Sequence, residues 1–223
     1  MKKVFWLIWK NPTTRNRYKV GTLTIHENNF DFRYDKEECN FKDIEFDFFP
    51  GFNDVNKIYS SKSLFENIVT RLPNKNRPDY VELIESYGLN IYSTDIDILE
   101  KTRGRLLTDT FEFVLAFNYQ NIEFEVAGVR HSSDFKKCKN LLEIGRKLVL
   151  EIEGTNKYDK YAIIIKFNEY KLGYVPRFYS KGLYEALKNN IFYDAYISNL
   201  NFNSKIFDEA ITVNVKLELK NNL

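Results

Sequence analysis

The stretch GRKLVLEIEGTNKYDKYAIII, residues 145–165, decides the fold class of the second half of this 223-residue chain. It predicts a strand at residues 148–153, a polar turn, and a nearly continuous apolar strand at residues 161–167. Asn156 and Asp159 lie in the turn, where their short polar side chains can hydrogen-bond to nearby backbone groups. The stretch therefore predicts two strands joined by a tight connection.

Short strand patterns continue on both sides of this pair. They occur, with one amphipathic helix at residues 180–188, at residues 122–129, 170–175, 195–200 and 210–219. Many short strands with one or two helices are typical of a small β-barrel. We place the start of this domain near residue 120 and treat residues 105–122 as a connector, which gives predicted domains at residues 1–118 and 119–223.

The first half predicts an antiparallel meander followed by helices. Strands are expected at residues 4–9, 18–25 and 30–34, with Asn28-Asn29 as a turn, and helices at residues 63–71, 78–87 and 95–102. Ser63 is a plausible cap for the first helix. The predicted fold class of the whole chain is α+β, mainly β.

An aromatic segment lies between the meander and the helices. Phe46, Phe48, Phe49 and Phe52 flank the turn signal Pro50-Gly51. We expect these rings to pack as core under a long loop, and an exposed binding surface is the alternative.

Charge and composition narrow the function classes. The formal net charge is +2, so a nucleic-acid contact requires a local basic patch. The apolar run at residues 4–9 is too short for a signal peptide, and no stretch approaches the length of a membrane span. We therefore expect a cytoplasmic protein that does not bind membranes.

Catalytic and metal-binding motifs are missing from the sequence. It contains no phosphate-binding loop, dinucleotide fingerprint, nucleophile elbow or zinc-protease motif, and Cys39 and Cys138 lie far apart. The acidic pair Asp95 and Asp97 begins a predicted helix, where capping explains it better than metal binding. We expect no cofactor and no enzyme activity, although the many carboxylates keep a nuclease or hydrolase as a third, unsupported alternative.

Two segments could contact DNA. Residues 130–147 contain six basic residues (Arg130, Lys136, Lys137, Lys139, Arg146, Lys147) against two acids, which is either a solvated face or a phosphate-binding patch. The segment TNKYDKYAI, residues 155–163, includes Tyr158, whose ring can stack on a base. From composition alone, a simple turn is the favoured interpretation of that segment.

Three motifs occur in an order that resembles the HIRAN domain family. They are FEVAGVRH (residues 124–131), the opening stretch at residues 145–165, and KLGYVPRFYSKGL (residues 171–183). The resemblance implies an OB-like or SH3-like barrel that binds single-stranded DNA, with a preference for a free 3′ end. DNA repair, replication and phage defence are the processes in which such binding would serve.

The resemblance also implies a set of DNA-binding residues. Tyr158 and Asp159 match the family's Tyr-Asp pair, which implies base stacking and a hydrogen bond to the 3′-terminal nucleotide, and Arg130 matches a basic residue after the first strand. His131 stands in place of the family's stacking tyrosine, and an imidazole stacks less well than a phenol ring. The full set of predicted nucleic-acid-binding residues is Arg130, His131, Asn156, Tyr158, Asp159, Lys160, Arg177 and Lys181.

A second resemblance covers residues 15–106. The segments VGTL (20–23), FDFRYD (30–35), 63–89 and DIDILEKTRGRL (95–106) are similar to the N-terminal subdomain of HipA-type toxin kinases. It implies a strand-and-helix domain and carries over no kinase activity. It also raises the alternative function of a regulatory adaptor that binds a protein partner through this half.

Overall fold

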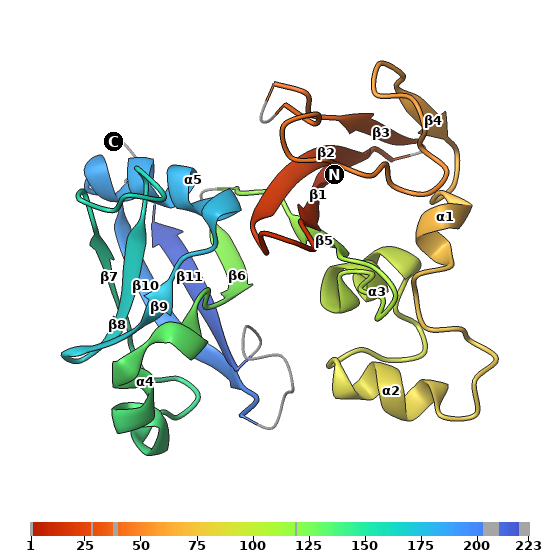
Figure 1. Cartoon of the computed structure of the whole chain (residues 1–223). Helices are drawn as coiled ribbons and strands as arrows, with labels where there is room; N and C mark the ends of the chain where they lie inside the picture. The colour runs from red at the N-terminus through yellow and green to blue at the C-terminus, as the bar shows by residue number, and fades with distance from the viewer. Residues whose placement is uncertain (1, 28, 38–39, 119, 203–209, 219–223) are drawn as a thin grey trace, which may run out of the picture. The chain divides into compact units, whose positions relative to one another are not determined.

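The computed structural model describes residues 2–27, 29–37, 40–118, 120–202 and 210–218 (Figure 1). The chain divides into two compact units, Met1–Ala116 and Phe117–Leu223. The architecture is α+β and mainly β, as predicted. The predicted turn residue Asn28, Cys39 and residue 219 at the end of the last predicted strand lie outside the described part of the chain.

Unit 1 is built on a five-stranded antiparallel sheet in the order β4-β3-β2-β1-β5. Its strands are β1 (Lys3–Lys10), β2 (Arg17–Ile25), β3 (Phe30–Tyr34), β4 (Tyr59–Ser61) and β5 (Phe111–Leu115). The predicted meander forms β1 to β3. The connector assigned to residues 105–122 is wrong in part, because β5 pairs with β1 and places Phe111 and Phe113 in the core.

Three helices lie between β4 and β5 in the chain. They are α1 (Glu66–Val69), α2 (Tyr80–Ser86) and α3 (Asp95–Thr102). The first is shorter than predicted and its N-cap is Phe65, without a side-chain cap, so Ser63 does not cap it. In α3, Thr94 and Asp97 form a reciprocal capping box, which confirms the capping interpretation for Asp97. Asp95 pairs instead with Lys75 (2.9 Å).

The aromatic segment of unit 1 is mainly core. Phe46, Phe49 and Phe52 are buried against the sheet, and Phe48 is 45% exposed. The Tyr34 hydroxyl donates to the Phe52 carbonyl (2.6 Å) and accepts from the Phe49 amide (3.0 Å), so it holds the loop over the sheet. The core interpretation is confirmed for these three phenylalanines.

Unit 2 contains two three-stranded antiparallel sheets. One has the order β10-β11-β6, and the other has the order β7-β8-β9. The strands are β6 (Asn121–Glu125), β7 (Val149–Ile152), β8 (Ile163–Phe167), β9 (Tyr170–Tyr174), β10 (Phe192–Leu200) and β11 (Ile211–Glu218).

Backbone bridges join these two sheets at both edges. Ala127 and Tyr174 exchange two backbone hydrogen bonds (2.8 and 2.9 Å) beyond β6, and Lys147 bridges to Tyr196 of β10. The six strands therefore follow one another around a ring, in which isolated bridges rather than continuous ladders connect the two sheets. A Cβ on Gly173 would lie 2.4 Å from the Ala127 carbonyl oxygen, so this closure requires glycine there.

Helical segments occupy the connections of unit 2. They are η1 (Val129–His131), α4 (Ser133–Cys138), η2 (Lys139–Leu141) and α5 (Arg177–Lys188), and in Figure 1 α4 and α5 lie at opposite ends of the unit. The predicted helix at 180–188 begins earlier, at Arg177, and α4 was not predicted. Cys138 is a buried free thiol. Among the described residues, no helix is long and apolar enough to span a membrane.

Candidate nucleic-acid interface

The loop between β7 and β8 is fixed by the side chain of Asn156. Its amide oxygen accepts from the backbone N–H groups of Tyr158 (2.9 Å) and Asp159 (3.0 Å). Its amide nitrogen donates to Glu153 (2.6 Å) at the start of the loop. The favoured turn interpretation is thus confirmed, and Asn156 acts within the turn.

The same turn leaves the ring of Tyr158 in solvent. Tyr158 is 88% exposed to solvent. Stacking on a base requires an accessible ring face, which Tyr158 provides. Turn and binding site are therefore compatible at this position, because Asn156 forms the turn and Tyr158 projects from it.

Asp159 connects the loop to helix α5. One carboxylate oxygen accepts from the Tyr161 backbone N–H (2.9 Å), and the other accepts from the Ser180 hydroxyl (2.8 Å). Ser180 is buried in the first turns of α5, where Arg177 and Lys181 are exposed. The structure therefore brings Asp159, Arg177 and Lys181 into one region.

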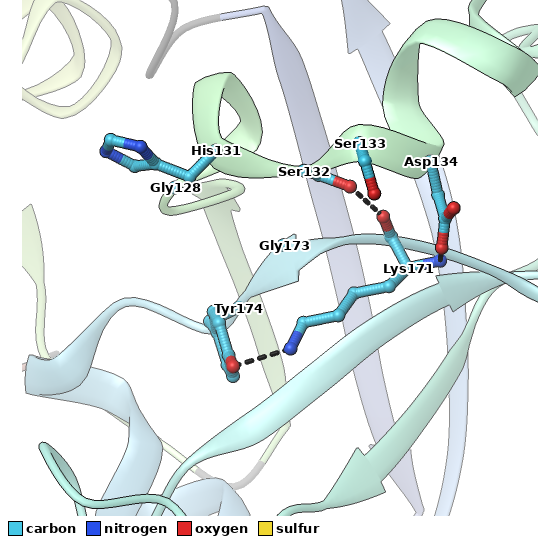
Figure 2. A pocket seen from close by; sticks show the side chains of 8 residues that line it. All are labelled: Gly128, His131, Ser132, Ser133, Asp134, Lys171, Gly173 and Tyr174. Carbon is cyan, nitrogen blue, oxygen red and sulfur yellow. Dashed lines mark hydrogen bonds between the residues drawn. The ribbon is translucent and has the colours of Figure 1, made fainter.

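His131 lies at the rim of a shallow hollow of about 290 Å³, and Arg130 precedes it in the chain. Figure 2 shows His131 at one end of the hollow and Tyr174 and Lys171 on its floor, with Ser132, Ser133 and Asp134 along the opposite side. Arg130 Nε donates to His131 Nε2 (2.9 Å), and both residues are exposed. The guanidinium and the imidazole are thus presented together.

A chain of hydrogen bonds links the hollow to the Tyr158 loop. Lys171 Nζ donates to the Tyr174 hydroxyl (2.5 Å), and that hydroxyl donates to Glu153 (2.9 Å), which also accepts from Asn156. The hydrogen bond from Asn156 is the main cause that lowers the pKa of Glu153. Glu153 therefore stays ionised at neutral pH and can hold both the loop and the floor of the hollow.

Lys171 is kept charged by the same chain. Burial alone would lower the pKa of Lys171, but its contacts with Tyr174 and Glu153 outweigh burial and raise it. A protonated ammonium at the floor of the hollow favours a negatively charged group nearby. Four further residues join the candidate site although the sequence did not single them out. Lys171, Tyr174 and Ser180 belong to the quoted motif at residues 171–183, and Glu153 belongs to the stretch at residues 145–165.

The positive charge of the basic run at residues 130–147 is partly neutralised by ion pairs. Lys137 pairs with Asp134 (2.8 Å), Arg146 with Glu143 (2.8 Å) and Lys147 with Asp194 (3.0 Å). These ion pairs are surface contacts of little energetic weight, yet they reduce the local positive field. Lys160, the remaining predicted residue, is exposed, and its ammonium lies 4.9 Å from the centre of the Tyr161 ring.

The predicted residues thus form two neighbouring groups in one domain. The first contains Asn156, Tyr158, Asp159 and Lys160 of the loop with Arg177 and Lys181 of α5, and the second contains Arg130 and His131. Among the described residues, no group of three or more His, Cys, Asp or Glu side chains is arranged to hold a metal ion.

The three sequence motifs and this barrel agree with a known family. Residues 119–220 match the family model of the HIRAN domain. The chain carries a HIRAN domain. The predicted resemblance of residues 15–106 to HipA-type proteins is not supported by any of the matches.

Two solved structures are similar to this chain. One is the crystal structure of a protein from Lactobacillus plantarum, with 21% identity, a TM-score of 0.38, and coverage of 44% of this chain and 92% of that one. The other is the crystal structure of the HIRAN domain of human HLTF, with 16% identity, a TM-score of 0.35, and coverage of 44% and 75%. No curated protein matches the sequence.

Proposed function

We propose that this protein binds single-stranded DNA or DNA 3′ ends through its HIRAN domain and acts as a binding protein without catalytic activity. Binding of such DNA is what the HIRAN family implies. The observation that carries the proposal is the exposed ring of Tyr158 on a loop anchored by Asn156, beside the exposed cations of α5.

Each group has a role suited to single-stranded DNA. The Tyr158 ring stacks on a base, a contact worth about 1–3 kcal/mol. Arg130 and Arg177 contact phosphates, which supply most of the affinity that does not depend on sequence. The carboxylate oxygens of Asp159 each accept one intramolecular hydrogen bond and keep lone pairs for a terminal sugar hydroxyl.

The His131 side chain supports Arg130 in this proposal. Its Nε2 accepts from Arg130 Nε, which orients the guanidinium. An imidazole in place of a phenol offers a smaller stacking surface, so we expect a weaker contribution to 3′-end binding from this position than from Tyr158.

The direct test is fluorescence anisotropy with labelled single-stranded oligonucleotides at low salt. The oligonucleotides carry either a free 3′ hydroxyl or a 3′ phosphate. We expect Tyr158→Ala and Arg130→Ala each to weaken binding, by roughly 5- to 150-fold for the tyrosine. The matched control is Tyr92→Ala, because Tyr92 of unit 1 is equally exposed at 87%.

Two results would overturn the proposal. One is the absence of binding by the unmodified protein at low salt, and the other is an unchanged dissociation constant in both variants. Incubation of the labelled DNA with the protein and Mg²⁺ tests the absence of catalysis, and we expect the oligonucleotide to remain intact.

The setting we propose is the cytoplasm, in repair, replication or phage defence, where free 3′ strands arise. The alternative of a protein adaptor rested partly on an exposed aromatic loop at residues 46–52. In the structure, Phe46, Phe49 and Phe52 are buried in the core, so only Phe48 of the four phenylalanines is exposed for such a contact. DNA binding is therefore the function that the described residues favour.

A further inference from the structure

One face of helix α5 carries a row of long side chains. Arg177, Lys181, Tyr184 and Lys188 follow one another at spacings of four, three and four residues, which places them along one side of the helix. Arg177, Lys181 and Lys188 are exposed, and Tyr184 is half-buried. The opposite side of α5, with Tyr179, Leu183 and Ala186, is buried in the core of unit 2.

This row meets the Tyr158 loop through two aromatic rings. The rings of Tyr184 and Tyr161 lie edge to face with centroids 5.3 Å apart. Lys160 Nζ lies 4.9 Å from the Tyr161 centroid, and Lys188 Nζ lies 5.4 Å from the Tyr184 centroid. Aromatic rings and cations therefore continue without interruption from the loop to the end of α5.

The charge of this strip is strongly positive. It contains Lys160, Arg177, Lys181 and Lys188, while Glu185 is the acid that α5 exposes beside them. Positive grooves with interleaved aromatic rings are the surfaces that bind single strands with little sequence preference. The strip also adjoins Asp159, which is tied to α5 through Ser180.

We propose that this strip, the α5 track, binds the nucleotides that precede the 3′-terminal ones held at Tyr158 and Asp159. The inference rests on the proposed function and extends it by naming the path of the strand. From Arg177 to Lys188 the helix rises about 16 Å. At 3.4 Å per stacked nucleotide this length accommodates up to about five nucleotides.

The α5 track predicts that affinity depends on strand length. A trinucleotide with a free 3′ end reaches only the Tyr158 loop, whereas a decanucleotide also covers α5. We expect Lys188→Glu and Tyr184→Ala each to weaken decanucleotide binding by about tenfold, a typical effect for loss of one stacking or phosphate contact. Trinucleotide binding should change less than about twofold, because neither side chain reaches it.

Matched variants separate DNA contact from folding. Tyr184→Phe keeps the ring and should bind the decanucleotide like the unmodified protein. Lys188→Ala should reduce the slope of log affinity against log salt by about 0.7, the value for one phosphate contact of a single strand. Lys62→Ala is the control, since Lys62 is an exposed cation of unit 1 and should leave the slope unchanged.

The outcomes distinguish this inference from the proposed function. If the unmodified protein binds both oligonucleotides and the α5 variants bind the decanucleotide equally well, the α5 track is overturned and binding at Tyr158 stands. If Lys188→Glu weakened binding of the trinucleotide and the decanucleotide equally, the α5 track would also be overturned, because the effect would not depend on strand length. If no oligonucleotide binds the unmodified protein, the proposed function itself fails.

Discussion

The aromatic loops of the two units use the same residue type in opposite ways. In unit 1, the loop that contains Phe49 and Phe52 packs around Tyr34, whose hydroxyl holds two backbone groups of the loop. In unit 2, the amide of Asn156 holds the loop, and Tyr158 points into solvent. A ring is left accessible where a small polar side chain performs the anchoring, and it is buried where the aromatic residue itself does so.

The difference separates residues that stabilise the fold from residues that bind. Burial raises the pKa of Tyr34, so its phenol remains a neutral hydrogen-bonding group at all physiological pH values. Tyr158 makes its hydrogen bond through its backbone N–H, which leaves the whole ring for a ligand. Substitutions in the first loop should therefore change stability, and substitutions in the second should change binding.

The largest effect is expected beneath the loop of unit 1. Arg71 is buried, donates two hydrogen bonds to Asp109 (2.7 Å each) and lies 5.1 Å from the centre of the Phe49 ring. We expect Arg71→Ala to lower the free energy of unfolding by about 3–5 kcal/mol, because it leaves a partly buried carboxylate unpaired. Urea denaturation followed by tryptophan fluorescence measures this loss in unit 1, which contains both tryptophans.

The control for Arg71 is an exposed pair of the same chemistry. Arg77 also contacts an aspartate, Asp79, at 2.7 Å, but both side chains are about half exposed. Arg77→Ala should leave the free energy of unfolding nearly unchanged, because solvent screens this exposed pair. Equal losses in the two variants would show that burial does not distinguish these pairs.

A smaller effect on stability is expected when the hydroxyl groups of Tyr34 and Tyr158 are removed in turn. Tyr34→Phe removes the hydroxyl that satisfies the Phe49 amide and the Phe52 carbonyl, so we expect a loss of about 1–3 kcal/mol in unfolding free energy. Tyr158→Phe should change stability by less than about 0.5 kcal/mol, because its side chain lies in solvent. Thermal unfolding of both variants tests the contrast, and similar midpoints would contradict it.

The sequence predicts the positions of most strands, but it does not predict the contacts that connect the two sheets of unit 2. Alternating and continuous apolar runs place most strands of both units within one to three residues, because burial imposes a period on the sequence. The strand Phe111–Leu115 was missed because residues 105–122 were assigned as a connector, and its pairing with β1 identifies it. The bridges at Ala127 and Lys147 that close the ring involve residues about 50 apart and leave no local pattern.

The sequence predicts which residues form the candidate site, but it does not show which of them contact one another. The motif order indicated Arg130, Tyr158 and Asp159, but the role of Asp159 in holding α5 depends on Ser180, 21 residues away. Glu153 looked like one more strand acid among many, and its contacts with Asn156 and Tyr174 exist only in the folded barrel. In the basic run, Asp134 and Glu143 pair with Lys137 and Arg146, while only Asp194, which pairs with Lys147, comes from a distant segment.

The smallest effect concerns the anchor of the Tyr158 loop. Asn156→Ala removes the acceptor of two backbone N–H groups while Asp159 still ties the loop to Ser180, so the fold should persist. We expect DNA affinity to fall by roughly 2- to 12-fold, which corresponds to about 0.5–1.5 kcal/mol for a lost anchoring hydrogen bond. The DNA affinity of Asn156→Ser should lie between those of the unmodified protein and Asn156→Ala, because a serine hydroxyl forms the same kind of turn more weakly. Anisotropy titrations with one oligonucleotide rank the three proteins; if Asn156→Ala binds as tightly as the unmodified chain, Asp159 alone is sufficient to position Tyr158.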